Sequence, residues 1–127
     1  MKIEHVGLFV VDLERTVEFY EQFFQAQRSD KYYNPRTTFS SYFLTFPSGA
    51  RLEVGTRDDL NKTRQEGYPL GYMHLAFSLG SKSAVDDLTE QITAAGCQHL
   101  SGPRTTGDGY YESVVCDSEG NQIELTV

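Results

Sequence analysis

The sequence repeats itself once, and a chain that carries one short pattern twice is expected to fold as two similar modules. The segment IEHVGLF at residues 3–9 is echoed by YMHLAFS at residues 72–78, which places His5 and His74 69 positions apart. The pattern Gly-x-x-apolar-Glu-apolar occurs at residues 49–54 and 120–125, with Glu53 and Glu124 71 positions apart. The nearly equal separations predict one strand–helix–strands unit that occurs twice, over about residues 1–57 and 71–127.

Each unit opens with an alternation of apolar and polar residues that is typical of a half-buried strand. The aliphatic stripe contains Val6, Leu8 and Val10 in the first unit, and Met73, Leu75, Phe77 and Leu79 in the second. His5 and His74 fall between the apolar positions, so both are predicted on the opposite face of their strands. Further strands are predicted over residues 38–46, 50–55, 112–116 and 121–127.

A helical pattern follows the first strand of each unit. Asp12 is a candidate N-cap in the first unit, and apolar residues then recur with helical spacing at Val17, Tyr20 and Phe24. In the second unit Ser83 and Asp86 resemble a capping box, followed by the same spacing at Val85, Leu88 and Ile92. Gly96 is the predicted stop of this second helix. The charged segment over residues 56–71 is predicted to link the two units.

The composition excludes several functional classes. The chain has 127 residues, which suits a single domain, and its formal net charge of −7 disfavours a nucleic acid partner. No apolar run is long enough to span a membrane, and no signal-peptide pattern is visible. Cys97 and Cys116 are too few for a disulfide framework or a Cys-based zinc site, although the sequence leaves one disulfide open. We therefore expect a cytoplasmic protein that binds neither nucleic acid nor membranes.

Each unit contributes one histidine from its first strand and one glutamate from its last, namely His5, Glu53, His74 and Glu124. Solvated strand faces also carry polar residues, but they tolerate any polar type, whereas the same two types recur here at matching places. If helices cover the aliphatic faces, the opposite faces can curve into a cup. Two imidazoles and two carboxylates would then bind one divalent transition metal ion, such as Zn, Ni, Co, Mn or Fe, and leave positions for substrate.

Other residues have weaker claims to a functional role. His99 has no counterpart in the first unit and is assigned to a loop, and Cys116 is assigned to the core rather than to a nucleophile. Arg57 is a candidate anchor for a substrate carboxylate, with a solvated linker charge as the alternative. Six aromatic residues either line the cup or pack within the sheets: Tyr32, Tyr33, Phe39, Tyr42, Tyr110 and Tyr111. No nucleophile elbow, P-loop, dinucleotide fingerprint or His-Glu-x-x-His motif occurs.

Three segments resemble one known superfamily. They are VVDLER with the following Phe19-Tyr20 pair, GYMHLAF at residues 71–77, and DSEGNQIEL at residues 117–125. Together with His5 they resemble the vicinal oxygen chelate superfamily of glyoxalases, bleomycin resistance proteins and dioxygenases. The resemblance implies an α+β fold of two βαβββ modules, which form a cup-shaped mixed sheet with helices on the outer face. It also implies a homodimer, with sites between modules of one chain or of two.

Within that superfamily the His, Glu, His, Glu quartet resembles glyoxalase I, or lactoylglutathione lyase, which isomerises the hemithioacetal of methylglyoxal and glutathione. The resemblance implies that Glu124 acts as the catalytic base and that Glu53 delivers or receives the proton on the opposite face. Glyoxalase I usually contacts glutathione through an arginine and an asparagine, at positions that here hold Phe9 and Arg57. These two residues are the candidate substrate-binding residues.

The predicted function is therefore a metal-dependent lyase or isomerase. Its predicted substrate is a small 2-oxo or 2-hydroxy carbonyl compound, with a thiol hemithioacetal of methylglyoxal as one candidate. A drug- or toxin-binding resistance protein without turnover, with or without metal, and an extradiol-type dioxygenase are the alternatives.

Overall fold

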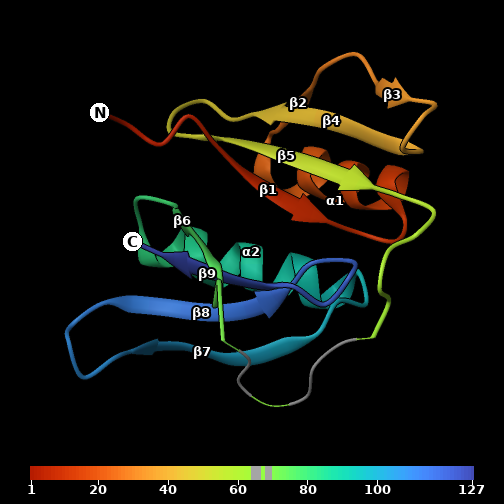
Figure 1. Ribbon diagram of the computed structural model, residues 1–127. Helices are drawn as coiled ribbons and strands as arrows, with labels where there is room; N and C mark the ends of the chain where they lie inside the picture. The colour runs from red at the N-terminus through yellow and green to blue at the C-terminus, as the bar shows by residue number, and fades with distance from the viewer. Residues whose placement is uncertain (64–66, 68–69) are drawn as a thin grey trace. The chain divides into compact units, whose positions relative to one another are not determined.

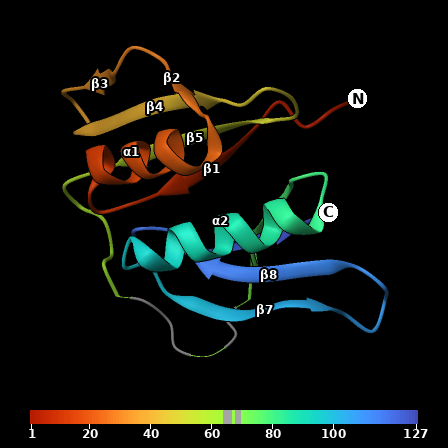
Figure 2. The same cartoon turned by 180° about the vertical axis from the view of Figure 1, so that it is seen from behind.

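The computed structural model describes residues 1–63, 67 and 70–127, which belong to two compact units, Met1–Arg64 and Gln65–Val127. Figures 1 and 2 show the chain from opposite sides, with a β-sheet and one helix in each unit. The two sheets and two helices confirm the predicted α+β class and its division into modules. None of the helices formed by the described residues has the length and apolar character needed to cross a bilayer.

The first unit contains a five-stranded mixed sheet covered on one face by one helix (Figure 2). Its elements in chain order are β1 (His5–Phe9), α1 (Leu13–Phe24), β2 (Gln27–Arg28), β3 (Tyr32–Asn34), β4 (Phe39–Thr45) and β5 (Arg51–Thr56). The strand order is β1-β5-β4-β2, and β3 also pairs with β4. The first strand is parallel to the last, while the other pairs are antiparallel.

The second unit repeats this arrangement with four strands. Its elements are β6 (Leu75–Ser78), α2 (Lys82–Ala94), β7 (His99–Thr105), β8 (Tyr111–Cys116) and β9 (Gln122–Thr126). The order is β6-β9-β8-β7, and again the first strand is parallel to the last, which then pairs antiparallel with the strand before it. The observed topology therefore repeats where the sequence pattern repeats.

The apolar side chains with helical spacing form the contact between each helix and its sheet. Val17, Tyr20 and Phe24 are buried in α1, and Val85 and Ile92 are buried in α2, as the spacing predicts. They pack with the aliphatic residues of the last strand in each unit, which are Leu52 and Val54 in β5 and Ile123 and Leu125 in β9. Because side chains alternate along a strand, the residues between these positions face away from the helix.

Several local predictions need correction. His99 lies in strand β7 rather than in a loop, and the N-cap of α2 is Ser81 rather than Ser83, since the Ser81 hydroxyl accepts the Ala84 N–H at 3.2 Å. Met73 lies before β6 and is exposed, so it does not extend the aliphatic stripe. The short strands β2 and β3 were not predicted either.

Other local predictions are confirmed. Asp12 is the N-cap of α1 and its carboxylate accepts the Arg15 N–H at 3.1 Å. Gly96, with φ of 89°, follows the end of α2, where a positive φ suits glycine. Cys116 is buried at the end of β8. Of the predicted linker over residues 56–71, positions 64–66 and 68–69 lie outside the described residues, and among the described positions only Thr56 belongs to a strand.

Candidate metal centre

The first unit places His5 and Glu53 side by side on the sheet face that α1 does not cover. Glu53 lies between the buried Leu52 and Val54 in β5, which fixes its side chain on the opposite face. In the parallel pairing Glu53 is opposite Gly7 of β1, and His5 is two residues before Gly7. The Nε2 atom of His5 is 3.9 Å from Oε2 of Glu53. Both residues therefore meet as the sequence pattern predicts within this unit.

The second unit repeats the same placement with His74 and Glu124. Glu124 lies between the buried Ile123 and Leu125 in β9 and is opposite Ala76 of β6, and His74 is two residues before Ala76. The Nε2 atom of His74 is 3.4 Å from Oε2 of Glu124. In each unit the residue opposite the glutamate is small, glycine or alanine, so the neighbouring strand does not crowd the carboxylate.

The chemistry and spacing of both pairs suit a transition metal ion. Imidazole nitrogen and carboxylate oxygen bind such ions at about 2.0–2.2 Å. Two atoms at about 2.1 Å from one ion lie about 3.0 Å apart at right angles, about 3.4 Å apart in tetrahedral geometry and about 4.2 Å apart at most. The separations of 3.4 and 3.9 Å fall within these limits. Among the residues that the structure describes, no group of three or more His, Cys, Asp or Glu side chains gathers as a metal site.

A carboxylate that the sequence analysis missed fixes the orientation of His5. Nδ1 of His5 is in close hydrogen-bonding contact with Oε2 of Glu4, and Arg51 donates to the other oxygen of Glu4. Because a carboxylate only accepts, His5 donates through Nδ1, and in the neutral ring Nε2 is left as an acceptor that faces Glu53. These hydrogen bonds from His5 and Arg51 lower the pKa of Glu4. Ligating histidines commonly have such a carboxylate partner.

The neighbours of the two glutamates differ. In the first unit the Ser41 hydroxyl donates to Oε1 of Glu53 at 3.0 Å, and Ser41 lies two residues before the cross-strand partner Phe43. In the second unit the corresponding position, two residues before Val114, is Glu112. Burial and the negative charge of Glu124 raise the pKa of Glu112. Glu124 therefore has a carboxyl neighbour at the position where Glu53 has a hydroxyl neighbour.

The candidate substrate-binding residues have different surroundings. Phe9 is 58% exposed at the end of β1, on the same face as His5 and Glu53. Arg57 follows β5 and donates Nε and Nη2 to Asp59 at 2.8 and 2.9 Å, so its guanidinium is held in a local ion pair. Strand alternation places Phe9 near the pair, whereas Arg57 lies beyond the end of β5, where alternation no longer fixes the direction of its side chain.

The aromatic candidates divide between the two faces. The hydroxyl of Tyr42 donates to Glu14 of α1, and the hydroxyl of Tyr111 donates to Asp86 of α2, so both residues belong to the helix-covered faces. Tyr33 pairs with Ser40, which lies on the same side of β4 as Tyr42. Tyr32 and Phe39 lie on the other face, with ring centroids 6.2 Å apart. Tyr110 is exposed immediately before β8.

Solved structures share this fold over nearly the whole chain, and one curated protein resembles it in sequence. A glyoxylase/bleomycin resistance protein/dioxygenase domain from Frankia sp. EAN1pec is 20% identical in sequence and superposes with a TM-score of 0.84. The alignment covers 100% of this chain and 97% of that one. The trypanothione-dependent glyoxalase I of Leishmania major is also 20% identical and superposes with a TM-score of 0.79. This alignment covers 99% of this chain and 86% of that one. An uncharacterized protein of Bacillus subtilis strain 168, YqjT, is 27% identical over 97% of this chain and 96% of its own length.

The sequence itself matches a family model. Residues 2–125 match the model of the Glyoxalase/Bleomycin resistance protein/Dioxygenase superfamily, so the match includes both units and all four candidate ligands. This family is the one that the sequence motifs resemble, and the repeated strand order agrees with its paired modules. The chain belongs to the Glyoxalase/Bleomycin resistance protein/Dioxygenase superfamily.

Proposed function

We propose that this chain is a metal-dependent lyase or isomerase of the glyoxalase kind. The proposed substrate is a small 2-oxo or 2-hydroxy carbonyl compound, and a thiol hemithioacetal of methylglyoxal is one candidate. The proposal depends on one observation, the recurrence of an imidazole–carboxylate pair at the same register position of both units. The likeness in fold to a glyoxalase I supports the same class of reaction.

The proposed cofactor is one divalent transition metal ion, Zn, Ni, Co, Mn or Fe, with His5, Glu53, His74 and Glu124 as its ligands. These ligands come either from one chain or from two copies in a homodimer. We also propose that the protein is cytoplasmic. Two carboxylates would offset the charge of the ion. When bound, such an ion supplies Lewis-acid stabilisation for negative charge that develops on two adjacent substrate oxygens.

The proposed reaction is a 1,2-proton shift. Glu124 takes the proton from the substrate carbon that bears the hydroxyl, and the bonding electrons move towards the adjacent carbonyl. Glu53 takes the hydroxyl proton as the new carbonyl forms and delivers it to the neighbouring carbon, and Glu124 returns its proton to the oxygen on that carbon. Both carboxylates are thus regenerated, the product is an isomer, and no oxidant or reductant is consumed. Each glutamate therefore has a role in proton transfer as well as in binding the ion.

Metal content and activity test this proposal directly. The protein, purified without an affinity tag, is expected to contain a first-row divalent metal by elemental analysis, and chelation is expected to lower its Tm because a bound ion stabilises only the folded state. The metal-loaded protein is expected to convert a methylglyoxal hemithioacetal or a related 2-oxo compound. Absence of metal together with no metal-dependent shift in Tm contradicts the proposal and favours a binding protein, whereas oxygen consumption with catechols indicates a dioxygenase.

A single variant tests the role of Glu124. Glu124→Gln is expected to lower turnover by about 10²–10⁴-fold, because a general base contributes a factor of this size, while much of the metal stays bound. Glu90→Gln is the matched control, since Glu90 is exposed on α2. Complete loss of metal in Glu124→Gln would instead make Glu124 only a ligand.

A further inference from the structure

The sheet face beside His5 and Glu53 carries a cluster of aromatic side chains. Phe9 and Phe39 have ring centroids 6.2 Å apart in an edge-on arrangement, and Tyr32 and Phe39 are also 6.2 Å apart. We call Phe9, Phe39 and Tyr32 the aromatic cluster. Phe9 and Tyr32 are 58% and 54% exposed, so their rings are accessible although large aromatic side chains are usually covered.

Strand register places this cluster next to the metal-binding pair. Gly55 is opposite Phe9 and lies two residues after Glu53 in β5. Phe39 lies over Gly55, since a Cβ atom at Gly55 would be 2.7 Å from Cε2 of the Phe39 ring. Because Gly55 has no side chain, the Phe39 ring can lie close to the backbone of β5, at the next position after Glu53 on the same face.

Open space adjoins both the pair and the cluster. A Cβ atom at Gly7, the residue opposite Glu53, would meet no atom within 4 Å. Gly7 also lies between His5 and Phe9 in β1, and alternate residues of a strand share a face. A small molecule bound next to Glu53 thus meets bare backbone at Gly7 and aromatic surface at Phe9.

The two arginines nearest to Glu53 along the chain already have acidic partners. Arg51, whose guanidinium lies 4.2 Å from the centroid of the Phe43 ring, is bound to Glu4, and Arg57 is bound to Asp59. Arg51 is the basic residue of β5, and Arg57 directly follows this strand. The face is therefore better suited to an apolar group than to the carboxylates of a peptide-like thiol.

We propose that the aromatic cluster binds an aryl or similarly flat apolar group of the substrate, next to two vicinal oxygens held at the metal site. This inference rests on the proposed function, because it assigns the substrate class of the same site. Stacking on Phe9 would hold the group by its faces and edges, as in other aromatic pairs. The substrate is then an aryl-substituted 2-oxo or 2-hydroxy carbonyl compound, rather than an adduct recognised through its charges.

Two chelating probes that differ by an aromatic ring test the inference. Acetohydroxamate and benzohydroxamate both bind metal through two oxygens, so their Kd values for the Co²⁺-loaded protein are measured by visible absorption and corrected for their affinities for free Co²⁺. Benzohydroxamate is expected to bind at least about fivefold more tightly after correction, as an aromatic contact of ordinary strength predicts. Phe9→Ala is expected to remove this preference. Tyr33→Ala, on the other face of the same strand as Tyr32, is the matched control and is expected to keep it.

The outcomes separate this inference from the proposed function. Equal corrected affinities with saturated Co²⁺, or a preference that survives Phe9→Ala, overturn the aromatic site and leave the metal site standing. A homodimer that Phe9→Ala dissociates, with no change in the preference, also overturns it, because a second copy then covers the cluster. A protein that binds no Co²⁺ overturns the proposed function and this inference with it. Circular dichroism of Phe9→Ala checks that the fold is retained.

Discussion

At the scale of single residues, Glu4 controls which ring nitrogen of His5 faces Glu53. Glu4→Gln keeps the size of the side chain but removes its charge, and an amide oxygen is a weaker acceptor for Nδ1–H than a carboxylate oxygen. We expect metal affinity to fall about 10–100-fold, the usual effect of losing such a partner. Calorimetric titration of the metal-free protein with Zn²⁺ measures this change.

The second unit provides the control for Glu4. The residue before His74 is Met73, which is exposed and has no charge, so Met73→Leu is expected to leave the Zn²⁺ affinity unchanged. An unchanged affinity in Glu4→Gln would show that the ring of His5 is held by other contacts. Its edge-on contact with Phe43, at 5.2 Å between centroids, is then the next candidate.

At the scale of elements, the structure begins α2 with a different N-cap, Ser81, from the one that the sequence pattern predicts, Ser83. Ser81→Ala is expected to destabilise the protein by about 1 kcal/mol, because the Ala84 N–H then loses its acceptor. Ser83→Ala is expected to cost less than about 0.5 kcal/mol, since Ser83 lies in the first turn and only contacts the Ser81 hydroxyl, at 3.2 Å. Urea unfolding of both variants measures the difference, and a larger loss in Ser83→Ala would restore the capping box of the sequence analysis.

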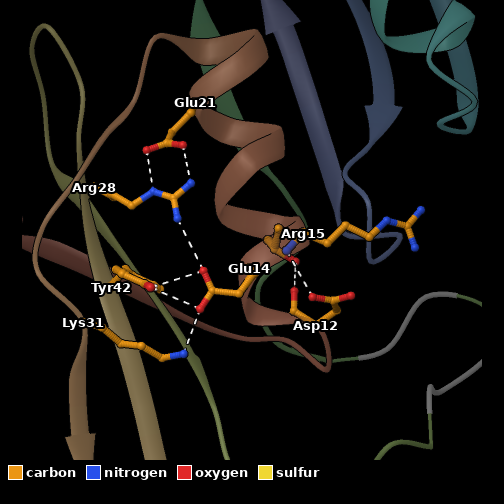
Figure 3. Close-up of polar contacts among 8 residues, drawn as sticks. Asp12, Glu14, Arg15, Glu21, Arg28, Lys31 and Tyr42 are labelled. Carbon is orange, nitrogen blue, oxygen red and sulfur yellow. Dashed lines mark hydrogen bonds and ion pairs between the residues drawn. The ribbon is translucent and has the colours of Figure 1, made fainter.

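The ion pairs that join α1 to the sheet predict a dependence of stability on pH. Arg28 donates to Glu21 at 2.5 and 2.7 Å and to Glu14 at 3.4 Å, and Lys31 and Tyr42 also donate to Glu14 (Figure 3). The hydrogen bond from Arg28 lowers the pKa of Glu21, and chiefly that from Lys31 lowers the pKa of Glu14. A carboxyl whose pKa is lowered on folding stabilises the fold above its unfolded pKa, and this stabilisation is lost as the pH falls.

Arg28→Met tests this dependence. At pH 7 we expect a loss of about 1 kcal/mol, because the pair with Glu21 is partly exposed and screened. The difference from the unmodified protein is expected to shrink as the pH falls below the unfolded value of about 4.5 and Glu21 becomes protonated. Urea unfolding between pH 3 and pH 7 measures it. Arg57→Met is expected to show only a weaker trend of the same sign, because its hydrogen bond also lowers the pKa of Asp59 but this local pair is exposed and screened by solvent. A difference independent of pH in Arg28→Met would assign its effect to packing on Tyr42.

The helices and long strands could be predicted because their side-chain periods are clear, whereas β7 could not. This strand contains Gly102 and Pro103 and has register shifts between His99 and Ser101 and between Ser101 and Arg104. Gly102 has φ of 79°, and a Cβ there would be 2.4 Å from the Glu112 carbonyl oxygen. Such a strand at a sheet edge breaks the alternation on which prediction depends, because glycine and proline are tolerated only there or at bulges.

At the scale of the whole molecule, the repeat explains why the two His–Glu pairs could be predicted and their hydrogen-bonding or charged neighbours could not. His5, Glu53, His74 and Glu124 recur at fixed places, so one sequence suffices to find them. The residues next to the two pairs, Glu4, Ser41 and Glu112, do not recur in the other unit. They come close to the pairs only because of strand register and side-chain orientation. Nothing in their spacing distinguishes them from other polar residues of a strand.

The metal content of histidine variants distinguishes one ion shared by both units from two separate ions. The protein is expected to bind one divalent ion per chain, and His5→Ala and His74→Ala are each expected to lose most of it, with little further loss in the double variant. Separate sites would instead leave about half of the metal in each single variant. His99→Ala is the control, since the third histidine of the chain lies in β7, where its Nε2 is 3.1 Å from the Ser101 carbonyl oxygen.

Mixing the two single variants then decides whether the ligands come from one chain or from two. If the first unit of one copy and the second unit of another share an ion, a mixed dimer of His5→Ala and His74→Ala contains one site with both imidazoles and one site with neither. Unfolding and refolding an equal mixture is then expected to restore about a quarter of the metal content, because half of the dimers are mixed and each has one intact site of two. If each chain binds its own ion, every site in the mixture lacks one imidazole and mixing restores nothing.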